Sequence, residues 1–186
     1  MSKLNAPRNH PQQVKKRGTG TPLFDNGQSA TDEVDTRVTD DKLWRELDAM
    51  FHFTIDVAAS SENAKCERFY DIAANGLFQR WDGETVWCNP PYSDLAAWVQ
   101  KASSETAATV VMLLPANRTE QPWWQTYIEP FRDGKHTNIR PISTWFLAGR
   151  RAFHDPKLKS AVHMPFGAVV VVFRGQPLSS PVKEGL

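Results

Sequence analysis

The sequence predicts an α/β fold in which helices cover a mixed, mostly parallel β-sheet. Segments with strand character alternate along the chain with segments of helical spacing, an order that is typical of such sheets. Two strand segments, residues 109–114 (TVVMLL) and 168–173 (AVVVVF), are continuous apolar runs rather than alternating ones. Continuous apolar strands indicate burial on both faces of the sheet. The 186 residues, 40% of them hydrophobic, suffice for one domain with a real core.

Three segments are expected to form helices: residues 42–50, 95–106 and 120–128. The first follows Thr39-Asp40-Asp41, which supplies an N-cap and first-turn acids. Within it, Leu43, Leu47 and Met50 recur at helical spacing. Ser93-Asp94 can cap the second helix, which is expected to bury one apolar face. The residues of that face are Leu95, Trp98, Val99 and Ala102.

Five segments are expected to form strands: residues 53–58, 85–88, 109–114, 139–147 and 168–173. Proline has no N–H to donate to a strand ladder, so Pro115 ends the third segment and the pair Pro90-Pro91 ends the second. The last two segments are near enough in sequence to pair, which predicts mixed pairing in the C-terminal part of the sheet.

One catalytic domain is expected over residues 21–176, between a disordered basic arm at residues 1–20 and a flexible tail at residues 177–186. The formal net charge is only +1, yet the arm carries several cations and no acid. These cations are Lys3, Arg8, Lys15, Lys16 and Arg17. The arm is polar and has no helical or alternating period, which predicts disorder. Either a solvated tail or a nonspecific grip on nucleic acid phosphates fits this composition.

The composition argues against several classes of protein. No apolar run approaches the roughly 18 residues that span a membrane, and the start lacks the apolar core of a signal peptide. The expected location is therefore the cytoplasm. Cys66 and Cys88 cannot build a disulfide framework, and five scattered histidines give no metal-ligand spacing. Free thiols and no metal are expected.

The strongest chemical signal is WCNPPY at residues 87–92, directly after an expected buried strand. A stiff loop with an amide before two prolines and an aromatic ring after them can hold a planar polar ligand. In an open α/β sheet, ligands bind beyond the carboxyl ends of the strands. Asp56 also stands at the end of an expected strand, so both features should lie at this edge.

At these residues the chain resembles amino-group methyltransferases that use S-adenosylmethionine, whose catalytic motif is NPPY. The wider pattern resembles the phage and prophage family of DNA adenine-N6 methyltransferases. The resemblance covers roughly residues 40–173, through FTIDVAASSENAKCERFY, NGLFQRW, VWCNPPYSDLAAWVQKA, VVMLLPANR and GRRAF. It implies a Rossmann-like methyltransferase fold and methyl transfer to the N6 amino group of adenine in DNA. A phage or prophage origin also implies the cytoplasm of a bacterial host.

The resemblance assigns roles in the NPPY loop. The adenine amino nitrogen is a poor nucleophile because its lone pair is delocalised, so two acceptors on its N–H bonds should favour a pyramidal nitrogen. The resemblance implies that the Asn89 side-chain oxygen and the Pro90 carbonyl are these acceptors. Pro91 then keeps the loop stiff and Tyr92 stacks on the base. A proline-stiffened turn with a packing tyrosine is the alternative.

The resemblance also implies a binding site for S-adenosylmethionine, near Asp56, Ala58, Ala59, Asp71 and Asn89. Asp56 is the candidate for the amino group or ribose of the cofactor, and Asp71 for its adenine end, with a turn acid as the alternative for Asp71. Ala59 and Ser60 stand where many relatives carry glycines. Small residues there still permit close approach of the cofactor.

The target base must leave the duplex, which predicts further DNA contacts. Phe153, within GRRAF, is the candidate for a second aromatic wall, and Arg118, Arg150 and Arg151 are candidates for phosphate or guanine contacts. Salt-bridged or solvated arginines are equally consistent. Two functional alternatives remain open: methylation of cytosine N4 or a protein glutamine amide, and a catalytically silent DNA-binding protein.

Overall fold

The computed structural model describes residues 39–135, 140–149, 152–154, 161–163 and 166–175. The expected arm at residues 1–20 and the expected tail at residues 177–186 both lie outside this part of the chain.

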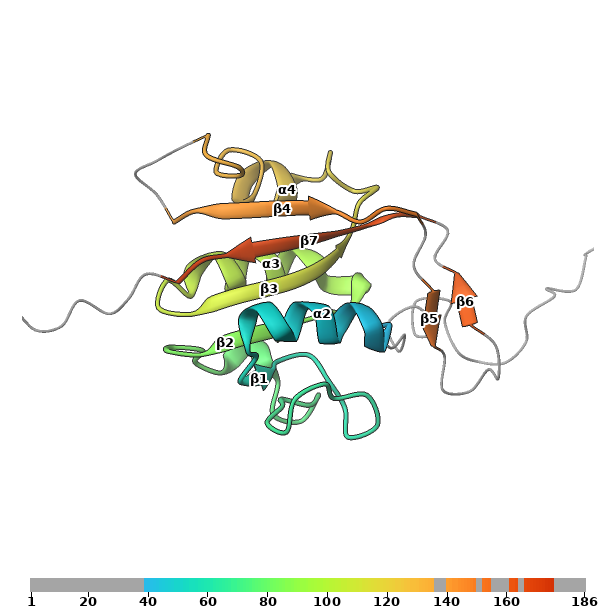
Figure 1. Cartoon of the computed structure of the whole chain (residues 1–186). Helices are drawn as coiled ribbons and strands as arrows, with labels where there is room; N and C mark the ends of the chain where they lie inside the picture. The colour runs from blue at the N-terminus through green and yellow to red at the C-terminus, as the bar shows by residue number, and fades with distance from the viewer. Residues whose placement is uncertain (1–38, 136–139, 150–151, 155–160, 164–165, 176–186) are drawn as a thin grey trace, which may run out of the picture.

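A five-stranded sheet forms the centre of the fold, in the order β1-β2-β3-β7-β4 (Figure 1). Its strands are β1 (Ile55–Asp56), β2 (Thr85–Cys88), β3 (Thr109–Pro115), β4 (Ile142–Phe146) and β7 (Ala168–Phe173). The first three pair in parallel, whereas β7 is antiparallel to both β3 and β4. Four strands therefore run in one direction and β7 alone is reversed, which confirms the prediction of a mixed, mostly parallel sheet.

Strands β2 and β7 match their predicted ranges, β3 runs one residue further than predicted and includes Pro115, and the edge strands are shorter than predicted. The prediction of residues 53–58 was too long, because only Ile55 and Asp56 pair with β2 as a strand, although Val57 N still donates to Trp87 O at 3.1 Å. The prediction of residues 139–147 was also too long. Pro141, which has no N–H, immediately precedes β4.

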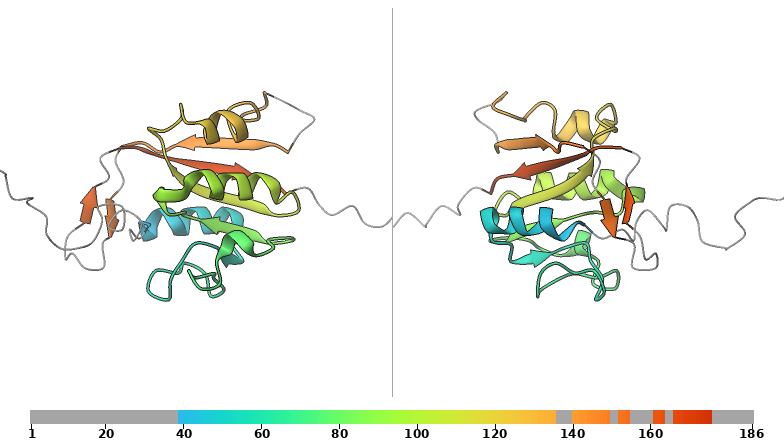
Figure 2. Two further views of the ribbon diagram at one scale, coloured as in Figure 1. Left: turned by 180° about the vertical axis from the view of Figure 1, so that it is seen from behind. Right: turned by 45° about the vertical axis from the view of Figure 1, so that its right-hand side comes forward.

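Helices cover the two faces of the sheet unequally, with α2 (Asp41–Phe51) on one face and α3 (Leu95–Ser104) and α4 (Pro122–Tyr127) on the other (Figures 1 and 2). Alternate residues of β7 face opposite layers: Val170 packs with α2, and Val171 packs with the α3 side. All six residues of β7 are buried, as its continuous apolar sequence predicted.

Helix α2 ends differently from its predicted pattern. Leu43 and Leu47 are buried, but Met50 is 58% exposed, and Phe51 packs against the core in its place. The N-cap is Asp40, whose carboxylate accepts a hydrogen bond from Lys42 N at 3.1 Å. Thr39 precedes this cap and its side chain is buried.

A two-stranded antiparallel ribbon, β5 (Ala152–His154) with β6 (Ala161–His163), is inserted between β4 and β7. It lies beyond the end of the sheet at which β4 stops and β7 begins (Figure 1). The sequence did not predict these strands, because each has only three residues.

Arg140 ties several segments together at the opposite end of the sheet. Its guanidinium donates to Ala102 O at 2.7 Å, to Phe173 O at 2.9 Å and to Ala108 O, and its Nε donates to Arg174 O at 2.8 Å. The residue is only 7% exposed. Burial lowers the pKa of Arg140 to about 10, which still leaves it charged at neutral pH.

Replacing this arginine should test how far the fold depends on it. We expect Arg140→Met to lower the free energy of unfolding by about 3 kcal/mol, because it leaves several buried carbonyls without a donor. The matched control is Arg80→Met, which removes an exposed ion pair with Asp82 and should change stability little. Urea unfolding of both variants measures the difference, and similar stabilities would contradict this account.

Candidate active site

The NPPY loop leaves the sheet at the carboxyl end of β2. Pro90 is buried, and Asn89, Pro91 and Tyr92 are half-buried. A short 3-10 turn, η2 (Tyr92–Asp94), connects the loop directly to α3. The loop is thus held by a buried strand on one side and a packed helix on the other.

The Asn89 side chain is oriented by a contact from a distant part of the chain. Its amide nitrogen donates to Thr39 Oγ1 at 3.2 Å. Thr39 is only 3% exposed and stands just before α2. The sequence indicated this threonine only as part of a helix cap, because nothing in its local pattern signals a partner fifty residues away.

Two aromatic rings lie next to each other beside this loop. The rings of Tyr92 and Phe166 have centroids 6.0 Å apart and planes inclined by 38°. Both side chains are half-buried, and Tyr92 packs against the cores on both faces of the sheet. The sequence analysis missed Phe166, although its position two residues before β7 places it at the carboxyl edge of β3.

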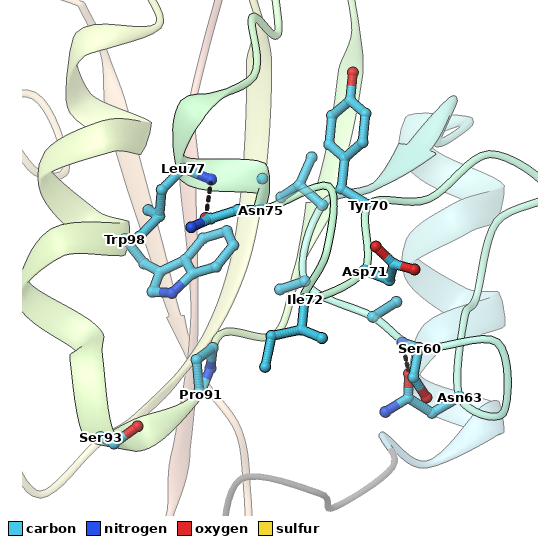
Figure 3. A pocket seen from close by; sticks show the side chains of 14 residues that line it. Ser60, Asn63, Tyr70, Asp71, Ile72, Asn75, Leu77, Pro91, Ser93 and Trp98 are labelled. Atoms are coloured by element: carbon cyan, nitrogen blue, oxygen red, sulfur yellow. Dashed lines mark hydrogen bonds between the residues drawn. The ribbon is translucent and has the colours of Figure 1, made fainter.

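A cavity of about 500 Å³ adjoins the other side of the NPPY loop. Its wall includes Ala59 and Asp71 from the loops after β1, Pro91 from the NPPY loop and Trp98 from α3. Figure 3 shows Trp98 and Leu77 on one side of the cavity and Asp71 and Ile72 on the other. The volume is in the range of small-molecule sites, and the wall is largely apolar with a few polar groups.

The acid predicted to touch the cofactor lies beneath the cavity wall. Asp56 is 3% exposed and does not line the cavity. Its carboxylate accepts hydrogen bonds from Ala58 N at 3.3 Å and Lys65 N at 3.1 Å, which close the loop of residues 57–65. Desolvation raises the pKa of Asp56 to about 6, against the opposing effect of these hydrogen bonds.

Three other residues of the predicted cofactor site, Ala58, Ala59 and Asp71, line the cavity, whereas Asn89 does not. Ala58 and Ala59 form part of one wall, and Ala59 N donates to Tyr70 O at 3.1 Å, which joins the two loops. Asp71 is exposed on the same side of the cavity as Ser60 and Asn63 (Figure 3), and its carboxylate also accepts from Ala74 N at 2.8 Å. Asp71 is therefore both a turn acid and a cavity residue.

A glycine outside the DVAAS segment permits the close contact between these loops. Gly76 is buried in the cavity wall, and a Cβ built there would lie 2.2 Å from Val57 O and 3.2 Å from the Trp98 ring. Only glycine allows this approach of one backbone to another. The small residues expected in the loop after β1 are thus complemented by a glycine at the start of the 3-10 turn η1 (Gly76–Phe78).

The predicted DNA-contacting residues are only partly described. Arg118 is half-buried and follows β3 by three residues, which places it at the same edge of the sheet as Asn89. Arg150 and Arg151 lie outside the described residues. Phe153 belongs to β5, where it pairs with Val162 of β6.

Within the described ranges, no group of three His, Cys, Asp or Glu side chains is placed to hold a metal ion. The same part of the chain contains no helix of the length and apolar character needed to span a membrane. Both cysteines are free.

The contact at Gly76 leads to a first prediction for the site. We expect Gly76→Ala to destabilise the protein by about 1 to 3 kcal/mol, because the new methyl overlaps the Val57 carbonyl and forces the loops apart. Gly167→Ala is the matched control, since a Cβ there would meet only Ala116 Cβ at 3.8 Å. Thermal unfolding compares the two, and equal melting temperatures would show that the wall yields freely.

The raised pKa of Asp56 predicts a dependence of stability on pH. Burial favours the protonated acid in the folded state, so the stability due to this group is complete below its unfolded pKa near 3.8 and is lost as pH rises through about 6. The loss between pH 4 and pH 8 should be about 2 kcal/mol relative to Asp56→Asn, which cannot ionise. Urea unfolding across this range measures it. Parallel pH profiles for the two proteins would contradict the prediction.

Comparison with known proteins identifies the relatives of this chain. A family described as DNA N-6-adenine-methyltransferase (Dam) matches residues 27–182. A protein named DNA N-6-adenine-methyltransferase from Escherichia phage T1 is 44% identical over 71 residues, which cover 36% of this chain and 29% of the phage protein.

A protein of the same name from Haemophilus phage HP1 (strain HP1c1) is 34% identical over 91 residues, which cover 42% of this chain and 53% of the relative. The chain thus spans about half or less of each of these relatives. Because the family match covers most of the sequence, including every described strand and helix, the chain belongs to the DNA N-6-adenine-methyltransferase (Dam) family.

Proposed function

We propose that this protein transfers a methyl group from S-adenosylmethionine to the N6 amino group of adenine in DNA. The observation that carries the proposal is the position of the NPPY loop, between a ligand-sized cavity that Pro91 lines and an edge of the sheet that presents Asn89, Tyr92 and Phe166. The family membership and the names of the phage relatives support the same reaction.

The cavity fits S-adenosylmethionine in size and chemistry. Apolar walls at Trp98, Leu77 and Ile72 suit a flat heteroaromatic ring, and the exposed Asp71 carboxylate can accept hydrogen bonds from hydroxyl or amino groups. Ala58, Ala59 and Gly76 allow the ligand to approach the backbone. When bound, the cofactor supplies an electrophilic methyl group on a sulfonium sulfur.

Asn89 and Pro90 would act on the amino group of the substrate. The side-chain oxygen of Asn89 and the carbonyl oxygen of Pro90 would each accept a hydrogen bond from one N–H of the amino group. These two hydrogen bonds draw the nitrogen lone pair out of conjugation with the ring. Two consecutive prolines keep these acceptors in place, and a misplacement of about 1 Å can cost on the order of a hundredfold in rate. The chain needs no covalent intermediate for this reaction.

Tyr92 and Phe166 would receive the base once it has left the duplex. Stacking on an aromatic face contributes about 1 to 3 kcal/mol per base. The half-buried Tyr92 ring is held from both sides of the sheet, so its position is fixed before the base arrives. Arg118 at the same edge is the described candidate for a phosphate contact.

The test of the reaction is incubation of the purified chain with S-adenosylmethionine and unmethylated DNA, followed by mass spectrometry of the nucleosides. We expect N6-methyl-2′-deoxyadenosine in the DNA hydrolysate. N4-methyl-2′-deoxycytidine instead would show that cytosine is the substrate, and the absence of any methylated nucleoside would contradict a DNA methyltransferase.

We expect Asn89→Ala to reduce turnover at least a hundredfold, as the loss of one transition-state hydrogen-bonding group commonly does. The affinity for S-adenosylmethionine should stay within about threefold, because Asn89 does not line the cavity. Asn63→Ala, in the cavity wall, is the contrasting variant and should weaken cofactor binding more than it slows turnover. Calorimetry and single-turnover kinetics separate the two effects; normal turnover by Asn89→Ala would refute the assignment.

For Tyr92, the substitutions separate the ring face from the hydroxyl. Tyr92→Phe should keep most activity, whereas Tyr92→Ala should lose about ten- to a hundredfold in kcat/KM through lost stacking. The ring also packs against Phe166, so kinetics are measured below the melting temperature of each variant. Near-normal kcat/KM for the folded alanine variant would make Tyr92 a packing residue only.

A further inference from the structure

We propose that Thr39 is a positioning residue for the transfer step: its buried hydroxyl sets the orientation of the Asn89 amide. The inference rests on the proposed function, because it concerns what Asn89 presents to the substrate. The hydrogen bond of 3.2 Å from Asn89 Nδ2 to Thr39 Oγ1 supports this inference. Thr39 is 3% exposed, so the contact is shielded from solvent on that side.

An asparagine needs such a contact because its amide can turn over. The torsion that carries the amide is broad and roughly two-fold, and its nitrogen and oxygen are nearly equal in shape. In one orientation Asn89 offers an acceptor to the substrate amino group. In the other orientation Asn89 presents its NH2 group to the substrate amino group, and two hydrogen-bond donors cannot pair with each other. In this structure the Thr39 hydroxyl oxygen accepts from Nδ2, and while it does so Oδ1 is directed away from Thr39 and remains available as the acceptor.

Thr39 is well placed to be a fixed partner. It immediately precedes the N-cap Asp40, and Leu43 and Leu47 anchor the following helix on the sheet with 4% and 3% exposure. Asp41 also forms an ion pair with Lys65, which links the start of the helix to the loop after β1. A threonine is stiff about its first side-chain torsion, so its hydroxyl is held where the backbone places it.

Thr39 does not belong to the cofactor cavity. Neither Thr39 nor Asn89 lines it, whereas Pro91, two residues further along the NPPY loop, does. Loss of the hydroxyl should consequently affect the transfer step and leave cofactor affinity unchanged. This separation distinguishes a positioning role from a binding role.

The test uses two variants of the full chain. Thr39→Val keeps the branched shape and removes the hydroxyl, and Thr39→Ser keeps the hydroxyl. We expect Thr39→Val to lower kcat on unmethylated DNA by about ten- to a hundredfold, while its affinity for S-adenosylmethionine stays within about twofold of wild type. The kcat of Thr39→Ser should stay within about threefold of wild type. The matched control is Thr109→Val, which removes a hydroxyl that accepts from Gly175 N at 3.1 Å at the far end of the sheet and should leave kcat unchanged.

Unchanged kcat in Thr39→Val would overturn the proposal, and so would an equal loss in the valine and serine variants, which would indicate packing. A loss confined to cofactor affinity would also overturn it. Side-chain amide NMR of Asn89 provides a readout that does not depend on activity: the amide protons should exchange slowly in wild type and in Thr39→Ser, and faster in Thr39→Val. If wild type methylates no DNA but this NMR pattern holds, the proposed function fails while the orientation of Asn89 by Thr39 stands.

Discussion

The parallel pairing of β1 with β2 is the constraint on which the site depends. Ile55 lies opposite Val86 and Asp56 opposite Trp87, and Val57 N then donates to Trp87 O at 3.1 Å. The two strands therefore end together, and the loop that follows each leaves from the same edge. One loop becomes the wall of the cavity and the other becomes NPPY, so a register shift of one residue would separate the two halves of the site.

The order of the elements and the main chemical feature could be predicted from the sequence, because both are local. Apolar runs such as residues 109–114 and 168–173 reveal buried strands, and two prolines after Cys88 reveal where a strand must stop. Phe166, Thr39 and Gly76 could not be assigned to the site in this way. Each acquires its role from a partner far along the chain: Tyr92, Asn89 and Val57, respectively.

Asp56 shows a second limit of sequence reasoning. An acid at the end of a strand is a reasonable ligand candidate, but a carboxylate can also hold a loop through backbone N–H groups, and the two uses have the same local sequence. Here both oxygens serve the loop of residues 57–65, and the acid that reaches the cavity surface is Asp71. The cofactor role of Asp56 remains a prediction, and the geometry favours support of the wall.

The reversed direction of β7 has a consequence for how such a protein can change during evolution. Because β7 is antiparallel to β4, the connection between them begins and ends at the edge of the sheet that carries NPPY, and the β5–β6 ribbon is inserted there. Residues can be added to or removed from this connection without altering the register of any strand of the central sheet. The sheet and the NPPY loop can then stay constant while the length of the neighbouring connection varies.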